Sequence, residues 1–310
     1  AADPGRFFGI MRMDSLEKPT LFGISPKQLL MGGVLTAFAL LAVLSWQYFV
    51  ALQNDINAFW DGQFFNYITL VPALGAALAG SLVTRQFTKG ERPYRIWMAF
   101  SLGMWFWFVG EISVIVFDFF PSGIVSPDFQ LVDVFWLLGY FSLGLSLTLQ
   151  LFSAYGVQQR RGLYIYAGMV VFAVLLASLL TEIVRKGESE DSWSFLFVTL
   201  LYPVLDVLAG GTAIWLSLLF GRGRWSRPWW GLILFAITDA IDAFYWSGGY
   251  DLVSAAAQNT LDFISLVTYP ASYMTAGLAL LANYFILRYG MDSGLLKPVK
   301  KGGLAQRGME

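Results

Sequence analysis

The chain contains eight long apolar runs, and no other feature constrains its fold as strongly. A transmembrane helix needs about 20 mainly apolar residues, and each run reaches that length. The runs are too long for strands and lack the polar-apolar alternation of a membrane barrel. They cover residues 28–52, 65–87, 95–118, 131–153, 163–184, 194–220, 228–248 and 260–288. We therefore expect an all-α integral membrane protein with eight transmembrane helices.

The overall composition supports membrane integration. Apolar residues make up 57% of the chain and charged residues only 13%, whereas soluble proteins average roughly 45–50% and about 25%. The N-terminal residues lack the basic, apolar and small-residue order of a signal peptide. The first apolar run is therefore expected to remain as a membrane span.

The distribution of basic residues predicts the orientation in the membrane. Lys and Arg accumulate in cytoplasmic loops. If both termini are cytoplasmic, 18 of the 20 Lys and Arg residues fall in inner segments, and Arg185 and Lys186 are the exceptions. Most loop carboxylates fall on the opposite side. We expect both termini to be cytoplasmic and the protein to lie in a cytoplasmic (inner) membrane of bacterial or archaeal type.

Short segments flank the predicted helices. Residues 1–27 are expected to be cytoplasmic, either as an amphipathic segment on the inner leaflet or as a basic tail. Ser25 followed by Pro26 is typical of a helix N-cap with proline in the first turn. Residues 290–310 form a basic cytoplasmic tail. The lipid bilayer is the first expected partner.

A pattern in the fourth apolar run recurs in the eighth. Asp133 is followed seven residues later by Tyr140, and Asp262 is followed at the same distance by Tyr269. Seven residues are two helical turns, so each acid and its phenol lie on one face of their helix. The recurrence suggests that the two halves of the chain are related.

Other landmarks recur in the same order and at nearly the same separation along the chain. The pairs are Pro72 and Pro203, Arg92-Pro93 and Arg227-Pro228, and Glu111 and Asp242. We predict a duplication of a four-helix unit, with repeats at 28–158 and 159–289. An even number of spans per unit makes the repeat parallel, with its axis along the membrane normal.

Four carboxylates fall inside predicted spans: Glu111, Asp206, Asp239 and Asp242. An ionisable group at the centre of a membrane costs about 2.5–3.5 kcal/mol and is a functional candidate by default. The predicted helix directions place these acids in the outer half of the membrane or near its midplane. No Lys, Arg or His is expected at that depth.

Such carboxylates must lie in an outward-open cavity, be protonated, accept hydrogen bonds or bind a cation. The candidate phenol donors are Tyr140, Tyr202, Tyr245, Tyr250, Tyr269 and Tyr273. We predict an extracytoplasmic acidic and aromatic cavity. Its candidate ligand-binding residues are Glu111, Asp133, Tyr140, Tyr202, Asp206, Asp239, Asp242, Asp262 and Tyr269.

Structural explanations compete with this hypothesis. Asp133 and Asp262 stand near the start of predicted helices, where a carboxylate caps free N–H groups. The other acids could form hydrogen bonds that hold neighbouring helices together. Asp239 and Asp242, three residues apart, could hold a hard cation or share one proton.

The residue types that are absent limit the chemistry. There is no cysteine and no histidine, which excludes disulfides, thiolate metal sites and histidine-ligated cofactors. No HExxH, GxSxG or P-loop motif occurs. We expect no enzymatic activity, no cofactor beyond a hard cation, and no nucleic-acid partner.

Several short motifs resemble a known family. These are Asp133 followed by LLGY ending at Tyr140, the sequence Tyr202-Pro203-x-x-Asp206, and the aspartates of the seventh and eighth runs. The chain resembles the polytopic membrane sensor region found N-terminal to bacterial diguanylate cyclases and histidine kinases. The resemblance implies outward detection of a small or lipid-borne ligand. Only about twenty residues follow the last predicted helix, so a signal would pass to a separate partner.

Three functions remain open. A sensor-like membrane protein acting through a membrane-protein partner or a second copy is the leading hypothesis. A structural accessory subunit of a larger membrane complex is the first alternative. A transporter for a cation or cationic solute is the second.

Overall fold

A computed structural model describes residues 23–53, 64–119, 131–155, 193–221, 223–246 and 249–293, with a few single positions elsewhere. These residues form α-helices, two short 3-10 helices, η2 (Gly249–Leu252) and η3 (Gly290–Ser293), and no strand. The α-helices are α1 (Pro26–Gln53), α3 (Phe64–Thr84), α4 (Arg92–Phe119), α5 (Leu131–Tyr155), α7 (Trp193–Phe220), α8 (Trp229–Trp246) and α9 (Ala255–Tyr289). The prediction of an all-helical chain is confirmed for this part.

Seven of the eight predicted runs coincide with helices. The run at 163–184 lies almost wholly outside the described residues. Six of the described helices are long and apolar enough to cross a membrane, namely α1, α3, α4, α5, α7 and α9. The other, α8, has only 18 residues, and two of them are aspartates. The count of eight spans therefore stays a prediction.

The start of α1 follows the predicted capping pattern. The Gln28 backbone N–H donates to Ser25 Oγ at 3.3 Å, and the Ser25 N–H donates to Gln28 Oε1 at 3.0 Å. This reciprocal pair is a capping box, which satisfies N–H groups that a helix leaves free at its first turn. Pro26 then occupies the first helical position, where its missing N–H costs nothing.

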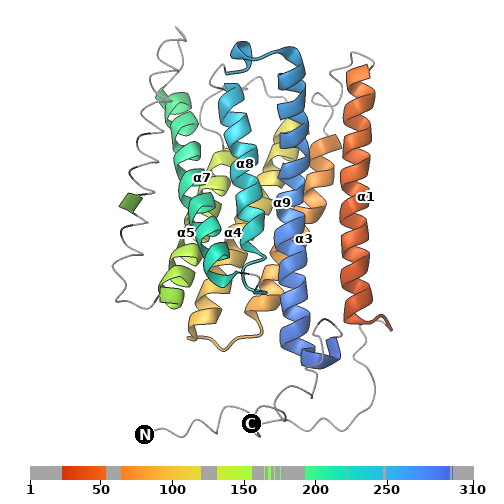
Figure 1. Ribbon diagram of the computed structural model, residues 1–310, viewed down its shortest axis with the longest axis vertical. Coiled ribbons are helices and arrows are strands. Elements are labelled where there is room, and N and C mark those ends of the chain that lie inside the picture. Colours follow the sequence, from red (N-terminus) through yellow and green to blue (C-terminus); the bar gives the residue numbers. More distant parts are fainter. Residues whose placement is uncertain are drawn as a thin grey trace, which may run out of the picture.

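Among the described helices, six form a closed ring, and α1 lies outside it (Figure 1). Each ring helix packs on two others, in the order α3, α4, α5, α7, α8, α9 and back to α3. Helix α1 contacts mainly α9, where the Tyr48 hydroxyl donates to the Asn259 carbonyl at 2.6 Å. The ring places α4, α5, α7, α8 and α9 around a shared interior.

The described basic residues gather at one end of the bundle. This end holds the start of α1, the α3–α4 and α7–α8 connections and the end of α9 (Figure 1). The described basic residues there are Lys27, Arg85, Lys89, Arg92, Arg95, Arg224, Arg227 and Arg288. The carboxylates of the predicted site lie away from this end. Which side of a membrane the basic end faces stays a prediction.

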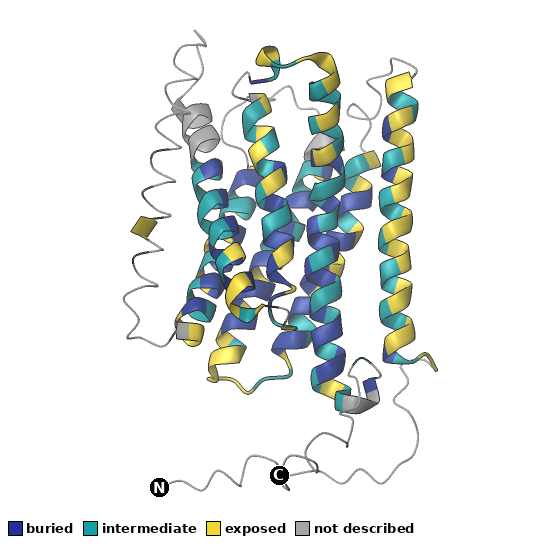
Figure 2. Cartoon of the chain, viewed as in Figure 1, coloured by how far each residue is buried: buried dark blue, intermediate teal, exposed yellow. Residues whose placement is uncertain are grey.

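The ring interior is closely packed, as the buried residues on the inner helix faces show (Figure 2). Trp107 of α4 is 4% exposed and lies among other aromatic rings. Its ring centroid is 5.2 Å from that of Tyr140 and 4.5 Å from that of Phe235. Aromatic side chains from α4, α5 and α8 thus meet inside the ring.

Two glycines allow neighbouring ring helices to approach closely. A Cβ on Gly103 of α4 would lie 2.6 Å from Leu143 of α5. A Cβ on Gly231 of α8 would lie 2.7 Å from the Ser272 carbonyl of α9. Small residues commonly mediate such packing in membranes.

Candidate functional site

The first polar centre of the ring joins one tyrosine to two aspartates. The Tyr140 hydroxyl on α5 hydrogen-bonds to Asp206 Oδ1 on α7 and to Asp239 Oδ2 on α8, the latter at 2.8 Å. Tyr140 and Asp206 are buried, with 8% and 5% of their surface exposed. A phenol carries only one proton to donate. It therefore cannot satisfy both carboxylates if both are ionised.

The same centre contains an unsatisfied oxygen. Asp206 Oδ2 is buried and has no hydrogen-bond partner among the described residues. A buried carboxylate oxygen without a donor carries a large desolvation cost. A proton on one of the two carboxyls removes a negative charge and supplies the missing donor. The geometry therefore favours one shared proton on this pair of aspartates.

The second polar centre has the opposite ratio of donors to acids. Glu111 Oε1 on α4 accepts from the Tyr269 hydroxyl at 2.5 Å and from the Tyr273 hydroxyl at 2.8 Å, both on α9. Glu111 is only 4% exposed and Tyr273 only 1%. Two neutral donors on one oxygen stabilise the ionised form of a carboxyl group. Glu111 is thus solvated by two phenols in place of water.

Hydrogen bonds of both centres cross the ring. Tyr140 reaches from α5 to α8, and Tyr269 reaches from α9 to α4, although neither pair of helices is adjacent in the ring. Phe235 packs edge-on against Tyr269 and Tyr273, with ring centroids 5.6 and 4.6 Å apart. The aromatic rings hold the phenols in place and exclude water between them.

Three further carboxylates lie toward the helix ends opposite the basic end of the bundle. The Tyr202 hydroxyl donates to Asp133 Oδ1 at 2.8 Å, the Ser265 hydroxyl to Asp242 Oδ1 at 2.9 Å, and the Tyr250 hydroxyl to Asp262 Oδ1 at 2.6 Å. Tyr250 lies in η2, beyond the end of α8. Partial burial, together with the hydrogen bond to Asp262, raises the pKa of Tyr250 above its ordinary value. Its phenol therefore remains a donor at neutral pH.

Five of the six predicted acids lie in a row, close enough for their charges to repel one another. Asp262 interacts with Asp242, and Asp242 with Asp239. Asp239 in turn interacts with Asp206 and with Glu111. The row extends from the partly exposed Asp262 near the start of α9 to the buried centre of the ring.

The sixth acid, Asp133, is connected to the other five through the side chain of Tyr202. Tyr202 donates to Asp133, and the Tyr202 ring centroid lies 5.9 Å from that of Tyr140. Asp133 also lies in the first turn of α5, where a negative charge is favourable. Asp133 thus stands in the first turn of its helix as predicted, and its tyrosine donor is Tyr202, one of the candidate donors, instead of Tyr140.

The capping role predicted for Asp262 is wrong. Helix α9 begins at Ala255, seven residues earlier, and its N-cap is Ser254, whose side chain accepts from the Ala257 N–H. The apolar pattern misplaced this boundary because residues 255–259 are polar or small and still helical. Asp262 is instead held by the phenol of Tyr250.

The hard-cation site proposed at Asp239 and Asp242 receives no direct support. Asp239 contacts Tyr140 and Asp242 contacts Ser265, so the two aspartates have different partners. No group of three or more acidic side chains in the described part of the chain is arranged to hold a metal ion. Asp242 is also exposed, in contrast to Asp206.

Some site residues could not be found from sequence. Ser265, Trp107 and Phe235 shape the centres but carry no titratable group and lie in ordinary apolar surroundings in the sequence. Of the expected tyrosine donors, five bind carboxylates: Tyr140, Tyr202, Tyr250, Tyr269 and Tyr273. Ser265 can be recognised as the donor to Asp242 only when the relative rotation of α8 and α9 is known.

Comparison with known proteins gave no further identification. No protein-family profile, curated protein or solved structure matched the chain. The arrangement of its own residues is therefore the basis for assigning a function.

Proposed function

We propose that the protein is a non-catalytic membrane sensor whose stimulus is a change in the protonation of the paired aspartates at Tyr140. The observation that carries this proposal is the single Tyr140 hydroxyl facing Asp206 and Asp239, with one carboxylate oxygen left unsatisfied. Buried carboxylates with too few donors bind protons tightly and respond to their loss. Buried acids within membranes are typical of proton relays and of sensing sites.

The row of acids supports access from the outer side. Asp242, the exposed acid three residues from Asp239 on α8, marks the side from which protons would reach the pair. Under the predicted orientation, this row opens toward the extracytoplasmic side. The aromatic packing around Trp107 and Phe235 opposes passage to the basic end.

The predicted duplication gives the proton a way to act on the whole bundle. If α3, α4 and α5 are superposed on α7, α8 and α9, the order of neighbouring helices around the ring stays the same. The same superposition places the hydrogen bond from α5 to α8 on the hydrogen bond from α9 to α4. Gly103 and Gly231 lie at close contacts of corresponding helix pairs, α4 with α5 and α8 with α9. Tyr140 thus joins the first repeat to Asp206 and Asp239 of the second. Loss of the shared proton would weaken the contact of Tyr140 with Asp206 and Asp239, and a separate cytoplasmic or membrane partner would respond to the resulting change in the bundle.

Infrared spectroscopy tests the shared proton directly. A protonated carboxyl has a carbonyl stretching band that an ionised carboxylate lacks, and the band shifts in D2O. We expect this band at neutral pH in the native protein and its loss in Asp206→Asn and in Asp239→Asn. Asp242→Asn, a matched change on the exposed acid of α8, should retain it. Absence of the band in the native protein would refute the proposal.

The sensor response can be measured by distances between spin labels. The chain has no cysteine, so Leu131→Cys on α5 and Leu252→Cys in η2 provide unique labelling sites, and both side chains are exposed. We expect the distance distribution in nanodiscs to change with pH in the native background. The change should vanish in Asp206→Asn and persist in Asp242→Asn. A distance distribution that does not change with pH would show that protonation of the site does not alter the conformation, and it would contradict the sensor proposal.

The two alternatives predict different results in related assays. A transporter would carry protons or alkali cations across proteoliposome membranes. Sustained flux would therefore favour the transporter alternative over the sensor proposal. An accessory subunit would co-purify with one partner in fixed stoichiometry, whatever the state of Asp206. Helix α1 favours testing this second alternative, because it packs mainly on α9 and most of its surface is exposed.

A further inference from the structure

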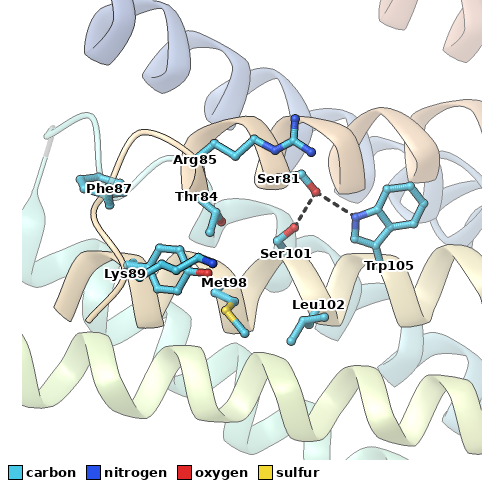
Figure 3. Close-up of a pocket in the computed structure, with 10 residues that line it drawn as sticks. Ser81, Thr84, Arg85, Phe87, Lys89, Met98, Ser101, Leu102 and Trp105 are labelled. Atoms are coloured by element: carbon cyan, nitrogen blue, oxygen red, sulfur yellow. Dashed lines mark hydrogen bonds between the residues drawn. The ribbon is translucent and has the colours of Figure 1, made fainter. Parts of the chain in front are cut away.

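An open cleft lies between α3 and α4 at the basic end, away from the acidic centres (Figure 3). Its volume is about 530 Å³, within the range of sites that hold small ligands. Arg85 at the end of α3 and Lys89 in the following loop border it. None of the residues used in the proposed sensor site lines this cleft.

The floor of the cleft is a fixed polar network. Ser81 Oγ donates to the Ala77 carbonyl at 3.0 Å and lies 3.0 Å from Ser101 Oγ. The Trp105 indole N–H also donates to Ser81 Oγ, at 2.9 Å. These bonds tie α3 to α4 and orient the indole ring along the cleft (Figure 3). The side chains at the floor of the cleft are therefore fixed by hydrogen bonds.

The two cations at the cleft have no counterion among the described residues. Glu91 is the only acid between residues 85 and 95, and its Oε2 accepts from the Thr88 backbone N–H at 3.1 Å. Neither Arg85 nor Lys89 forms an ion pair in the described structure. Arg and Lys together provide both planar and point-charge donors for a phosphate group. The charge at the cleft thus complements an anion.

The neighbouring surface is apolar and faces outward. Met98 and Leu102, four residues apart on α4, are 41% and 42% exposed, and both line the cleft. Two unpaired cations at the end of the bundle, directly beside an exposed apolar strip on a membrane helix, match the layout of a lipid headgroup above its acyl chain. Basic pockets between membrane helices bind anionic headgroups.

We propose that the α3–α4 cleft binds one anionic phospholipid, with its phosphate on Arg85 and Lys89 and an acyl chain along Met98 and Leu102. Under the predicted orientation, the lipid belongs to the cytoplasmic leaflet. A free inorganic phosphate would satisfy the cations but would leave the apolar strip without an occupant. The two occupants therefore differ in a measurable way.

Native mass spectrometry of the delipidated protein tests this site. The probes are phosphatidylglycerol, phosphatidylcholine and inorganic phosphate, each added back separately. The test variant is Arg85→Gln with Lys89→Gln, and the matched control is Arg92→Gln with Arg95→Gln, which removes the same charge from exposed positions that do not line the cleft. All four positions are at the surface or in a connection, so thermal melting should confirm that both variants fold.

We expect one phosphatidylglycerol to be retained by the native protein and the control, and its affinity to fall at least about tenfold in the test variant. Phosphatidylcholine should bind weakly to all three proteins. Equal losses in the two variants would show a general attraction of the basic loop and overturn the site. Inorganic phosphate binding as tightly as the lipid would also overturn the proposal, because the apolar strip would then contribute nothing.

Discussion

The two tyrosine–carboxylate centres of the ring use the same chemistry in opposite proportions. At the first centre, one phenol, Tyr140, faces two carboxyls, Asp206 and Asp239. At the second, two phenols, Tyr269 and Tyr273, face the single carboxyl of Glu111. The two phenols at Glu111 therefore offset part of the cost of burying this carboxyl group. The aspartate pair has too few and requires a proton.

The proposed repeat shows which positions account for this difference. The matching prolines, intramembrane acids and tyrosines of the two halves provide the alignment. Counted from these landmarks, Gly75 stands opposite Asp206, Phe108 opposite Asp239 and Gly144 opposite Tyr273. Under the predicted repeat, equivalent positions of the two halves therefore carry different numbers of phenols and carboxyls. The number of donors per carboxyl, and not burial alone, determines which form is stable.

The largest effect should follow from removing the donors of Glu111. Tyr269→Phe with Tyr273→Phe leaves a buried carboxylate without partners, and we expect the free energy of unfolding to fall by about 3–6 kcal/mol. Adding Glu111→Leu should recover most of this loss, because no polar group then remains to be satisfied. Denaturant titration in micelles measures both. A triple variant no more stable than the double variant would contradict the account of Glu111 as a buried polar group that depends on the two phenols.

Replacing the acids themselves should have a smaller effect on the free energy of unfolding, and the effect should differ between Glu111 and Asp206. Glu111→Gln replaces a carboxyl that accepts two phenols with an amide and should cost about 1–2 kcal/mol. Asp206→Asn supplies N–H donors to a centre that lacks them, so it should cost less than about 1 kcal/mol or be stabilising. Thermal unfolding of the two variants side by side gives the comparison. A larger loss for Asp206→Asn would indicate that the aspartate pair is ionised and would remove the contrast between the centres.

The smallest effect is expected outside both centres. Ser265→Ala removes the donor to Asp242, which is exposed. Water can replace this donor, so the free energy of unfolding should change by less than about 0.5 kcal/mol. Tyr202→Phe, which removes the donor to the buried Asp133, is the control and should cost more. A Ser265→Ala loss as large as that of Tyr202→Phe would show that Asp242 belongs to the buried network.

Much of the fold could be predicted from local patterns. Seven apolar runs became helices near the expected bounds, and the capping box at Ser25 formed as the sequence indicated. The main boundary error was the start of α9, where a polar first turn precedes the apolar run. Its cause is physical: an N-cap serine and small residues continue a helix beyond the apolar stretch that a bilayer requires.

The candidate site was only partly predictable. The sequence identified the acids and their tyrosine donors, because ionisable groups inside apolar runs are costly and need such partners. The spacing of Asp133 with Tyr140, and of Asp262 with Tyr269, placed each pair on one helix face, but the hydroxyls of both tyrosines bind acids of other helices. The partner of each acid depends on how neighbouring helices rotate and approach.

The sequence by itself determined the long apolar helices, the separation of basic and acidic ends and the position of each carboxylate along its helix. These properties follow from residue type and from a helix rise that is the same in every helix. Only the tertiary structure decided that Tyr140 serves two aspartates while Glu111 receives two tyrosines. That ratio depends on contacts between residues up to 162 positions apart, and no local pattern encodes it.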